Sequence, residues 1–337
     1  MRYKSIVYHP NLKFLSLQKT ISPEDCLEEA LLLAKSLDIE VVISEVVRID
    51  RPNNSTLLNK GRLADLERKV KELDIDLVII DGKLTPIQQR NLERNVKIKV
   101  IDRTRLILDI FERRASTREG SLQVELAQLD YQKTRLVKSW THLERQRGSL
   151  SFVGGPGESQ LEIDKRLIND QIIKVKKKLK EFRNTRKLHR NQRTKKPYYI
   201  VALVGYTNAG KSTLFNSLTG EGVLSKDMLF ATLDTKMKRL NYPNTKNIIL
   251  TDTVGFISAL PTELIMAFRS TLEELLYADI VINVRDLSSK YFDTQNIDVM
   301  DTIEQLGKQV TTSNYIEVLN KIDLLDETEL DLINRNK

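Results

Sequence analysis

In the first hundred residues, stretches with apolar side chains at every third or fourth position alternate with short runs of β-branched residues. The first spacing predicts amphipathic helices and the second predicts strands. The predicted strands cover residues 6–8, 39–49, 77–80 and 98–101, and the predicted helices cover residues 23–37, 61–73 and 88–94. Ser22 stands before the first helix as an N-cap. Because strands alternate with helices, residues 1–102 predict a small parallel α/β domain.

The apolar pattern changes between residues 103 and 196, where it follows the heptad spacing of packed helices. One stripe consists of Leu122, Leu126, Leu129, Lys133, Leu136, Trp140 and Leu143, and a second consists of Ile168, Ile172, Val175, Leu179 and Phe182. Between the stripes lies a glycine-rich loop that contains Gly154, Gly155 and Gly157. Two helices joined by such a loop predict an antiparallel helical hairpin with the loop at its tip. The loop could also be a plain connector, and its glycines do not decide between the two interpretations.

A third pattern begins at residue 197. The apolar run 199–204 predicts a strand and residues 213–218 predict a helix, with the pattern G-x-x-x-x-G-K-S between them. In that context backbone N–H groups and the helix N-terminus bind phosphate. Lys211 would reach the β and γ phosphates, and the Ser212 hydroxyl would be a ligand of Mg²⁺. The predicted phosphate-binding residues are Gly205, Tyr206, Thr207, Asn208, Ala209, Gly210, Lys211 and Ser212.

Two further motifs follow predicted strands in the same region. Asp252, Thr253, Val254 and Gly255 follow a strand at 247–251, and Asn320, Lys321, Ile322 and Asp323 follow a strand at 315–319. Asp252 would support the metal, and the N–H of Gly255 would contact the γ phosphate. The Asp323 carboxylate can accept hydrogen bonds from the N1–H and the 2-amino group of guanine, a pair of donors that adenine lacks. Three motifs in this order predict a GTPase domain over residues 197–337, with a mostly parallel sheet and helices on both faces; an ATPase would require the last motif to be accidental.

The segment between the first two motifs contains a candidate switch, formed by Phe230, Ala231, Thr232, Leu233 and Asp234. Thr232 is placed to offer its hydroxyl to Mg²⁺ and its N–H to the γ phosphate, so Ser212 and Thr232 are the predicted metal ligands. Phe256 and Ile257 follow Gly255, and neither side chain can orient water by hydrogen bonding. No catalytic residue is assigned. Hydrolysis is expected to be slow unless a partner, the backbone or other groups hold the water.

Only residues 324–337 follow the third motif. A complete domain of this type would add another strand, a loop that contacts the base and a closing helix. We therefore expect a shortened GTPase domain, with a weaker hold on the base and a less protected sheet edge.

Composition indicates the number of domains and the cellular compartment of the protein. The chain has 337 residues, of which 40% are hydrophobic and 30% are charged, and this length allows two or three domains. No apolar run approaches the length of a membrane span, and the N-terminus lacks a signal-peptide core. The single cysteine, Cys26, excludes an internal disulfide and is interpreted as a buried apolar residue of a protein in a reducing compartment. We expect a cytoplasmic protein with no integral membrane association, and the three histidines are too scattered to suggest a metal site.

Positive charge is concentrated in one segment. Residues 165–196 contain 14 Lys and Arg residues against Asp170 and Glu181, so this segment alone exceeds the net charge of +8 of the whole chain. A solvated helix face usually mixes signs, and this one therefore predicts contact with a polyanion, with Lys176, Lys177 and Lys178 as candidate RNA contacts. A membrane surface is a weaker alternative, because the apolar residues of the segment form a narrow heptad seam.

The sequence resembles the HflX family of ribosome-associated GTPases over nearly its whole length. The resemblance rests on Leu84–Leu92, Asp102–Phe111, Thr117–Gly120, Leu126–Leu129, Gly154–Glu162, Gly205–Ser212, Phe230–Asp234 and Asp252–Phe256. It implies an α/β domain and a helical hairpin before a GTPase domain, with GTP or GDP and Mg²⁺ as ligands and the large ribosomal subunit as partner. Some members of the family split stalled ribosomes, so ribosome splitting, rescue or biogenesis is the expected setting.

The resemblance further implies that the loop Gly154–Gly157 reaches toward the peptidyl-transferase region and that the basic helix lies on ribosomal RNA. We expect a monomer with no DNA partner. The alternative hypothesis is an RNA- or ribosome-binding protein whose shortened GTPase domain no longer cycles through hydrolysis.

Overall fold

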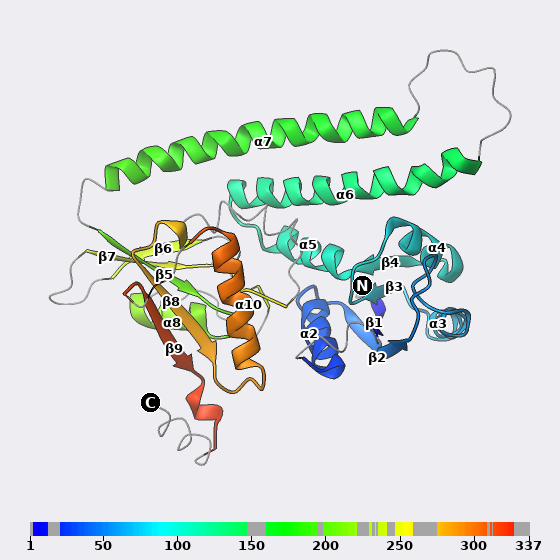
Figure 1. Cartoon of the computed structure of the whole chain (residues 1–337), viewed down its shortest axis with the longest axis horizontal. Coiled ribbons are helices and arrows are strands. Elements are labelled where there is room, and N and C mark those ends of the chain that lie inside the picture. The colour runs from blue at the N-terminus through cyan, green and yellow to red at the C-terminus, as the bar shows by residue number, and fades with distance from the viewer. Residues whose placement is uncertain are drawn as a thin grey trace. The chain divides into compact units, whose positions relative to one another are not determined.

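The computed structural model describes residues 3–12, 21–146, 160–193, 198–220, 229–230, 233, 235–240, 247–258, 275–308, 311 and 313–326. The chain divides into two compact units (Figure 1). Unit 1 comprises residues 1–113 and 124–178, and unit 2 comprises residues 114–123 and 179–337. Each unit contains one β-sheet. Within the described ranges, no helix combines the length and the apolar composition that crossing a bilayer requires.

The sheet of unit 1 is entirely parallel, as the alternating pattern predicts. Its strands are β1 (Lys4–Leu12), β2 (Glu40–Ile49), β3 (Leu77–Ile80) and β4 (Lys99–Asp102), and their order is β2-β1-β3-β4. The helices that connect them are α2 (Pro23–Lys35), α3 (Lys60–Glu72) and α4 (Pro86–Val96). From β1 the chain winds outward to β2, and from β3 it winds outward in the other direction to β4. The switch point of the winding therefore lies between β1 and β3, at their carboxyl ends.

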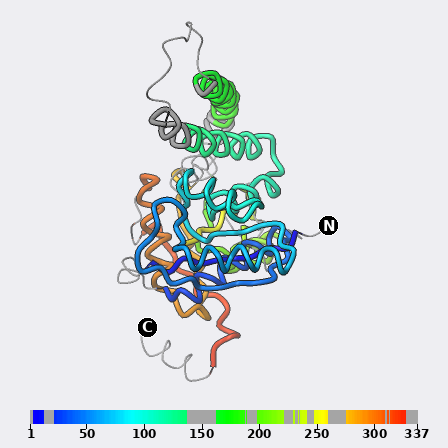
Figure 2. Tube along the Cα trace, turned by 90° about the vertical axis from the view of Figure 1, so that its right-hand side faces the viewer, coloured from blue at the N-terminus to red at the C-terminus, as the bar shows by residue number. Residues whose placement is uncertain are grey.

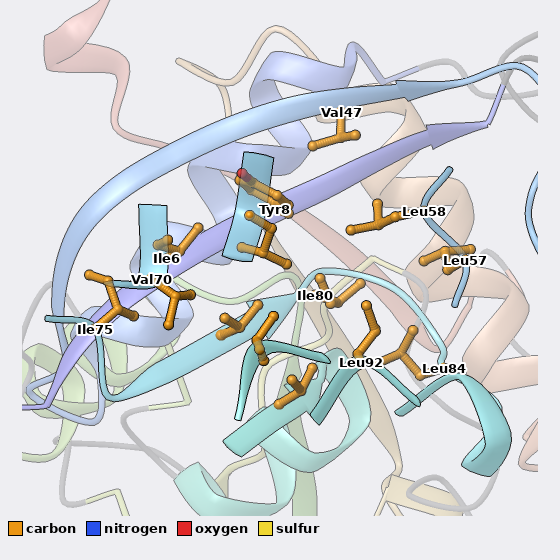
Figure 3. Packing of buried hydrophobic residues seen from close by; sticks show 14 of the residues in the cluster. Ile6, Tyr8, Val47, Leu57, Leu58, Val70, Ile75, Ile80, Leu84 and Leu92 are labelled. Atoms are coloured by element: carbon orange, nitrogen blue, oxygen red, sulfur yellow. The ribbon is translucent and has the colours of Figure 1, made fainter. Parts of the chain in front are cut away.

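The core of unit 1 explains why its middle strand β3 is a continuous apolar run. All four residues of β3 are buried, and its Val78 and Ile80 share one hydrophobic cluster with Ile6 and Tyr8 of β1. Figure 3 shows Ile6, Tyr8 and Ile80 in the cluster that also contains Val70 of α3 and Leu92 of α4. A central parallel strand is covered on both faces, so the polar alternation of a half-exposed strand is lost.

Local side chains set where the helices of unit 1 begin. The Ser22 hydroxyl accepts a hydrogen bond from the N–H of Asp25 at 3.2 Å, which confirms the predicted N-cap of α2. In α4, Thr85 and Gln88 form a reciprocal capping box, with Pro86 in the first turn. This helix therefore begins before the predicted residue 88, because the cap rather than the apolar pattern fixes its start.

Two long helices form the predicted antiparallel hairpin. They are α6 (Arg118–Gln146) and α7 (Gln160–Arg193), and within unit 1 the segments 124–146 and 160–178 run side by side in opposite directions (Figure 1 and Figure 2). The stripe residues Leu122, Leu129, Ile172 and Val175 are buried. Val124 and Ala127 are buried as well, so α6 buries a broader face than its heptad stripe. The side chains of Trp140 and Leu143 and the loop that holds Gly154, Gly155 and Gly157 lie outside the described residues.

One helix of unit 1 is not singled out by the sequence patterns. Helix α5 (Arg103–Arg114) buries Leu106, Ile107, Leu108, Ile110 and Phe111 almost completely. A helix that is covered on several sides lacks the one-sided apolar periodicity by which amphipathic helices are detected.

The buried carboxylate of Asp102 joins α6 to the sheet of unit 1. Asp102 is the last residue of β4. Its carboxylate accepts hydrogen bonds from the hydroxyl of Tyr131 at 2.9 Å and from Nη2 of Arg135 at 2.5 Å. Burial, and then the charge of Asp102, raise the pKa of Tyr131 above its usual range, so the phenol stays protonated and donates.

Unit 2 contains a five-stranded, mostly parallel sheet. Its strands are β5 (Tyr199–Val204), β6 (Lys236–Arg239), β7 (Ile248–Asp252), β8 (Ile280–Asp286) and β9 (Tyr315–Asn320), in the order β6-β7-β5-β8-β9. Only the edge strand β6 is antiparallel to its neighbour. The helices described with it are α8 (Lys211–Thr219), α10 (Phe292–Gln305) and the short 3₁₀ helix η1 (Ile322–Leu324).

The parallel strands of unit 2 repeat the winding of unit 1, because the order β7-β5-β8-β9 matches β2-β1-β3-β4. Helix α8 contacts β5 and β7, whereas α10 contacts β8. Right-handed crossovers that wind in opposite directions place their helices on opposite faces of a sheet, and Figure 1 shows this arrangement. The switch point of unit 2 lies at the carboxyl ends of β5 and β8, where a ligand site is expected in an open α/β sheet.

Candidate functional site

The glycine loop (residues 205–212) occupies the switch point of unit 2, directly after β5. Gly205 has a φ of +140°, and a Cβ there would collide with the carbonyl oxygen of Val284 on β8. Gly210 has a φ of +95°, and a Cβ there would collide with Nδ2 of Asn320. Both positions therefore require glycine, for the backbone angle and for the close approach of a neighbouring strand end.

Helix α8 begins at the end of this loop with its amide groups uncapped by any side chain. Gly210 is the N-cap, makes no side-chain cap, and is followed by a first turn without acidic residues. The first N–H groups of a helix have no partner inside the helix, and the helix dipole makes this end positive. The start of α8 is thus built to receive an anion.

Lys211 is buried at this point, with only 5% of its surface exposed. Its Nζ donates hydrogen bonds to the carbonyl oxygens of Gly205 at 3.0 Å and Tyr206 at 2.6 Å. Burial lowers the pKa of Lys211 to about 8, against the opposing charge of Asp252. An anion that approaches Nζ of Lys211 would therefore stabilise the charged form of this buried ammonium.

The second motif meets the glycine loop from the end of β7. The Ser212 hydroxyl donates to Oδ2 of Asp252 at 2.8 Å. The N–H of Phe256 donates to the carbonyl oxygen of Gly205 at 3.1 Å, and the N–H of Thr207 donates to the carbonyl oxygen of Phe256 at 2.6 Å. These bonds join the two segments as a short β-bridge beyond the end of the sheet.

Gly255 lies at the centre of this junction. A Cβ on Gly255 would stand 2.9 Å from Cα and Cγ2 of Thr207 and 3.0 Å from Nζ of Lys211. Any side chain larger than glycine would therefore displace the groups around the ammonium. Phe256 and Ile257, the residues that follow, are each only 3% exposed.

The third motif reaches the loop from the end of β9. Nδ2 of Asn320 donates to the carbonyl oxygen of Ala209 at 2.8 Å. Lys321, with a φ of +60°, forms an ion pair with Asp286 at 2.7 Å. Asp323 lies in η1 and is exposed to solvent. Three motifs that are spread over more than a hundred residues of sequence are thus joined by direct contacts.

Two residues of the candidate switch are buried, and three lie outside the residues that the structure describes. Phe230 and Leu233 are each 2% exposed, while Ala231, Thr232 and Asp234 lie outside the described residues. The candidate RNA contacts Lys176, Lys177 and Lys178 are exposed on α7.

Sequence reasoning missed the contribution of β8 to the site. Val284 makes Gly205 obligatory, and Asp286 holds Lys321. The signal was the apolar run at 280–284 between the second and third motifs, which marks a buried strand at the correct interval.

At the equivalent switch point of unit 1, polar side chains form hydrogen bonds with one another. The Nδ1–H of His9, after the middle of β1, donates to Oδ2 of Asp81 at 2.7 Å, and Nη1 of Arg103 donates to Oδ1 of Asp81 at 2.7 Å. Nη2 of Arg103 donates to Oε2 of Glu29 on α2 at 2.7 Å. Burial would raise the pKa of Asp81, but the charge of Arg103 and the bond from His9 outweigh it and hold that pKa below its ordinary value.

A groove of about 610 Å³ lies elsewhere in unit 1, between α4, α6 and α7. Its lining combines the apolar Leu136 and Ile168 with charges of both signs, such as Arg90 and Glu93. None of the three motifs contributes to it. Within the part of the chain that the structure describes, no cluster of three His, Cys, Asp or Glu side chains could hold a metal ion.

Three protein-family models match the chain in succession. A model described as "GTP-binding GTPase N-terminal" matches residues 24–112, and one described as "GTP-binding GTPase Middle Region" matches residues 114–193. A model described as "50S ribosome-binding GTPase" matches residues 200–321.

Similar proteins agree with these matches. The chain is 47% identical over 314 residues to GTPase HflX of Magnetococcus marinus, which is 92% of this chain and 72% of that protein. It is 46% identical over 302 residues to GTPase HflX of Lacrimispora saccharolytica, which is 90% of this chain and 70% of that protein. The crystal structure of SsGBP in complex with GDP resembles the chain with a TM-score of 0.55 at 24% identity, over 99% of this chain and 88% of that one, and so supports the fold.

The relatives are well above 30% identical over most of both chains, and the family models follow the order of the structural elements. The fold, the order of the motifs and these relatives lead to one conclusion: the chain belongs to the HflX family of GTPases.

Proposed function

We propose that unit 2 binds GTP and GDP at the glycine loop and hydrolyses GTP there with Mg²⁺. The observation that carries the proposal is the contact of all three motifs around the uncapped start of α8. Backbone N–H groups and Lys211 would bind the phosphates. Ser212 would exchange its bond to Asp252 for a bond to Mg²⁺, with Thr232 as the second side-chain ligand.

We propose that Asp323 selects guanine. Its carboxylate is exposed in η1, and its loop is fixed by the bonds of Asn320 to Ala209 and of Lys321 to Asp286. A carboxylate accepts two hydrogen bonds and donates none, which matches the N1–H and 2-amino group of guanine. Bound adenine would leave the carboxylate unpaired, at a cost of about 1–3 kcal/mol.

An exchange of nucleobase tests this assignment. Xanthine carries a carbonyl oxygen where guanine has its 2-amino group, so the amide of an Asp323→Asn variant matches xanthine better than guanine. We expect the variant to bind GDP about 100-fold more weakly, from the loss of about 3 kcal/mol of hydrogen bonding, and to prefer xanthosine diphosphate. Calorimetric titration of both proteins with both nucleotides measures the exchange.

Asp301→Asn is the matched control, because Asp301 is an exposed carboxylate of α10 in the same unit. Its affinities should equal those of the unaltered chain. If Asp323→Asn kept its preference for guanine, the base would be recognised elsewhere.

We propose further that the protein is a cytoplasmic factor that binds the large ribosomal subunit through the basic face of α7. The support is the concentration of exposed lysines on α7 and the description of the model that matches the GTPase domain. Phosphate contacts by lysine release counterions and make binding dependent on salt. Because Phe256 and Ile257 are apolar and buried, hydrolysis is expected to be slow alone and to be stimulated by the ribosome.

Co-sedimentation with purified large subunits at several salt concentrations tests the ribosomal proposal. Replacement of Lys176, Lys177 and Lys178 by Gln should weaken binding and reduce the slope of log affinity against log salt by about 2. Replacement of Lys60, Lys71 and Lys99 by Gln removes the same charge from exposed positions outside α7 and should change little. An equal effect of both triple variants would show a diffuse charge effect and contradict the assignment to α7.

The nucleotide dependence of the same assay tests the coupling between the two functions. A GTP analogue should bind large subunits more tightly than GDP, and large subunits should raise the rate of GTP hydrolysis. Equal binding in all nucleotide states, with no hydrolysis, would instead support a non-cycling RNA-binding protein.

A further inference from the structure

The hydroxyl of Thr207 is a buried polar group with no hydrogen-bond partner. The residue is 7% exposed, and Oγ1 makes no hydrogen bond in the structure. A buried hydroxyl without a partner costs about 1–3 kcal/mol, so native proteins retain few of them. Valine has nearly the same shape and would avoid this cost. The Thr207 hydroxyl is therefore a group that a ligand could satisfy, and its place in the chain decides whether one reaches it.

Thr207 lies beside Gly255 and Lys211, the two residues that would contact the γ phosphate of the proposed site. A Cβ built on Gly255 would lie 2.9 Å from Cγ2 of Thr207 and 3.0 Å from Nζ of Lys211, so the three residues pack closely against one another. The backbone of Thr207 is fixed there by the bond from its N–H to Phe256. The side chain of Thr207 thus belongs to a part of the loop whose backbone is fixed, and its methyl group lies where the ammonium of Lys211 meets the second motif.

Four neighbouring side chains are apolar or already engaged in hydrogen bonds. Phe256 and Ile257 are buried hydrocarbons. The hydroxyl of Thr253 donates to the carbonyl oxygen of Leu203 at 2.6 Å, and that of Ser212 donates to Asp252. A threonine hydroxyl combines one donor with two acceptor lone pairs, so it can accept a hydrogen bond from water while it donates to a phosphate oxygen.

We infer that Thr207 is a positioning residue that holds the attacking water against the γ phosphate, an inference that rests on the proposed nucleotide site. The water oxygen forms a bond to the γ phosphorus as the bond from phosphorus to the β–γ bridging oxygen breaks. GDP leaves with that electron pair, and the proton of the water ends on inorganic phosphate. Thr207 accepts a hydrogen bond from the water, donates one to a phosphate oxygen and is unchanged at the end of the reaction.

Single-turnover hydrolysis by three variants tests the inference. Thr207→Val removes the hydroxyl and keeps the shape, so we expect the rate of GTP hydrolysis to fall about 10- to 100-fold, as for the loss of one hydrogen bond to a charged reacting system. The affinity for GTP should change less than about threefold, which separates positioning from binding. Thr207→Ser retains the hydroxyl and should recover most of the rate.

Thr251→Val is the matched control. Thr251 on β7 is also fully buried, and its Oγ1 also lacks a hydrogen-bond partner, but it alternates with Asp252 to the other face of the strand. This variant should hydrolyse GTP at the unaltered rate.

The outcomes distinguish the inference from the function on which it rests. Full hydrolysis by a Thr207→Val protein that binds GTP normally would overturn the role of Thr207. Equal slowing by Thr251→Val would also overturn it, because the effect would then come from the packing of threonine rather than from its place. Failure of the unaltered chain to bind GTP would overturn the proposed nucleotide site itself, and the binding titration reveals this before any rate is measured.

Discussion

The two units of this protein share the winding of their parallel strands but use the switch point of that winding in opposite ways. In unit 1, His9, Asp81 and Arg103 occupy the ends of β1 and β3, and both His9 and Arg103 donate hydrogen bonds to the Asp81 carboxylate at 2.7 Å. In unit 2, the same place between β5 and β8 holds the glycine loop and a buried Lys211 without an ion-pair partner at its ammonium nitrogen in the described structure. The topology marks a location, and the polar groups there decide whether it binds a ligand.

The helix that follows β1 and the helix that follows β5 show the same contrast. Helix α2 begins with the Ser22 cap and carries Glu24 and Asp25 in its first turn, so its own side chains satisfy the amide groups and the positive dipole end. Helix α8 begins with Gly210, without a side-chain cap or an acidic residue in the first turn. One helix supplies its own anion, whereas the other is built to take an anion from outside.

The difference has an energetic consequence. The network of unit 1 contributes to the stability of its fold, since both oxygens of Asp81 are paired. The buried ammonium of Lys211 lowers the stability of unit 2, because burial disfavours its charged form. Binding sites commonly retain such groups at a cost in stability, and the ligand removes the cost when it binds.

The largest effect is expected on GDP binding at the switch point of unit 2, where Lys211 lies. Lys211→Met should reduce the affinity for GDP about 1,000-fold, because removal of one partner of a buried charge pair costs about 3–5 kcal/mol. The same variant should stabilise the nucleotide-free unit 2 at pH 7 by an amount on the order of 1–3 kcal/mol, since it no longer buries an ammonium. Calorimetry measures the affinity, and hydrogen exchange of the β5 amides measures the stability.

The sign of the pH dependence provides a control for this explanation. The pKa of Lys211 is about 8 in the folded chain against an ordinary 10.5, so the full cost of burial is present below pH 8. As the pH rises from about 8 to 10.5, the folded chain loses this proton before the unfolded chain does, and the cost disappears. The stability advantage of Lys211→Met should shrink over that interval. An advantage that did not change with pH would assign the effect to packing instead of charge.

Much of this contrast could be predicted from the sequence. Gly205, Lys211 and Ser212 are specified by backbone geometry and phosphate chemistry, so their spacing predicts a phosphate site and the strand and helix around it. The structure contains both elements, as β5 and α8. The parallel sheets and the helical hairpin were predicted because their periodicities are local.

The remainder depends on contacts between distant segments. Sequence patterns did not single out α5, which is covered on several sides, or the bond between Asn320 and Ala209, which joins two segments far apart in the chain. They also gave no reason to connect His9 with Asp81 and Arg103, because no short motif links them. A closed polar network is recognised only once the fold brings its members together.

A smaller effect is expected on the stability of unit 1, at the switch point where Asp81 pairs with His9 and Arg103. It would sharpen the contrast between the two units. Asp81→Asn leaves Arg103 with one carboxylate instead of two, and we expect it to lower the free energy of unfolding of unit 1 by about 3 kcal/mol. Affinity for GDP should not change, because Asp81 touches none of the three motifs. Hydrogen exchange of the β3 amides reports the loss of stability.

Glu72→Gln is the matched control, since it breaks an ion pair with Arg68 in which both side chains are more than half exposed, and it should cost less than about 0.5 kcal/mol. The depressed pKa keeps Asp81 ionised down to and below the ordinary value near 3.8, so its contribution to stability should be constant from about pH 8 to 5 and fall only in stronger acid. A loss of GDP affinity in Asp81→Asn would contradict the comparison, because the closed network would then support the nucleotide site and not only its own sheet. A loss of stability no larger than that of Glu72→Gln would show that burial and completeness of the network contribute nothing beyond an exposed pair.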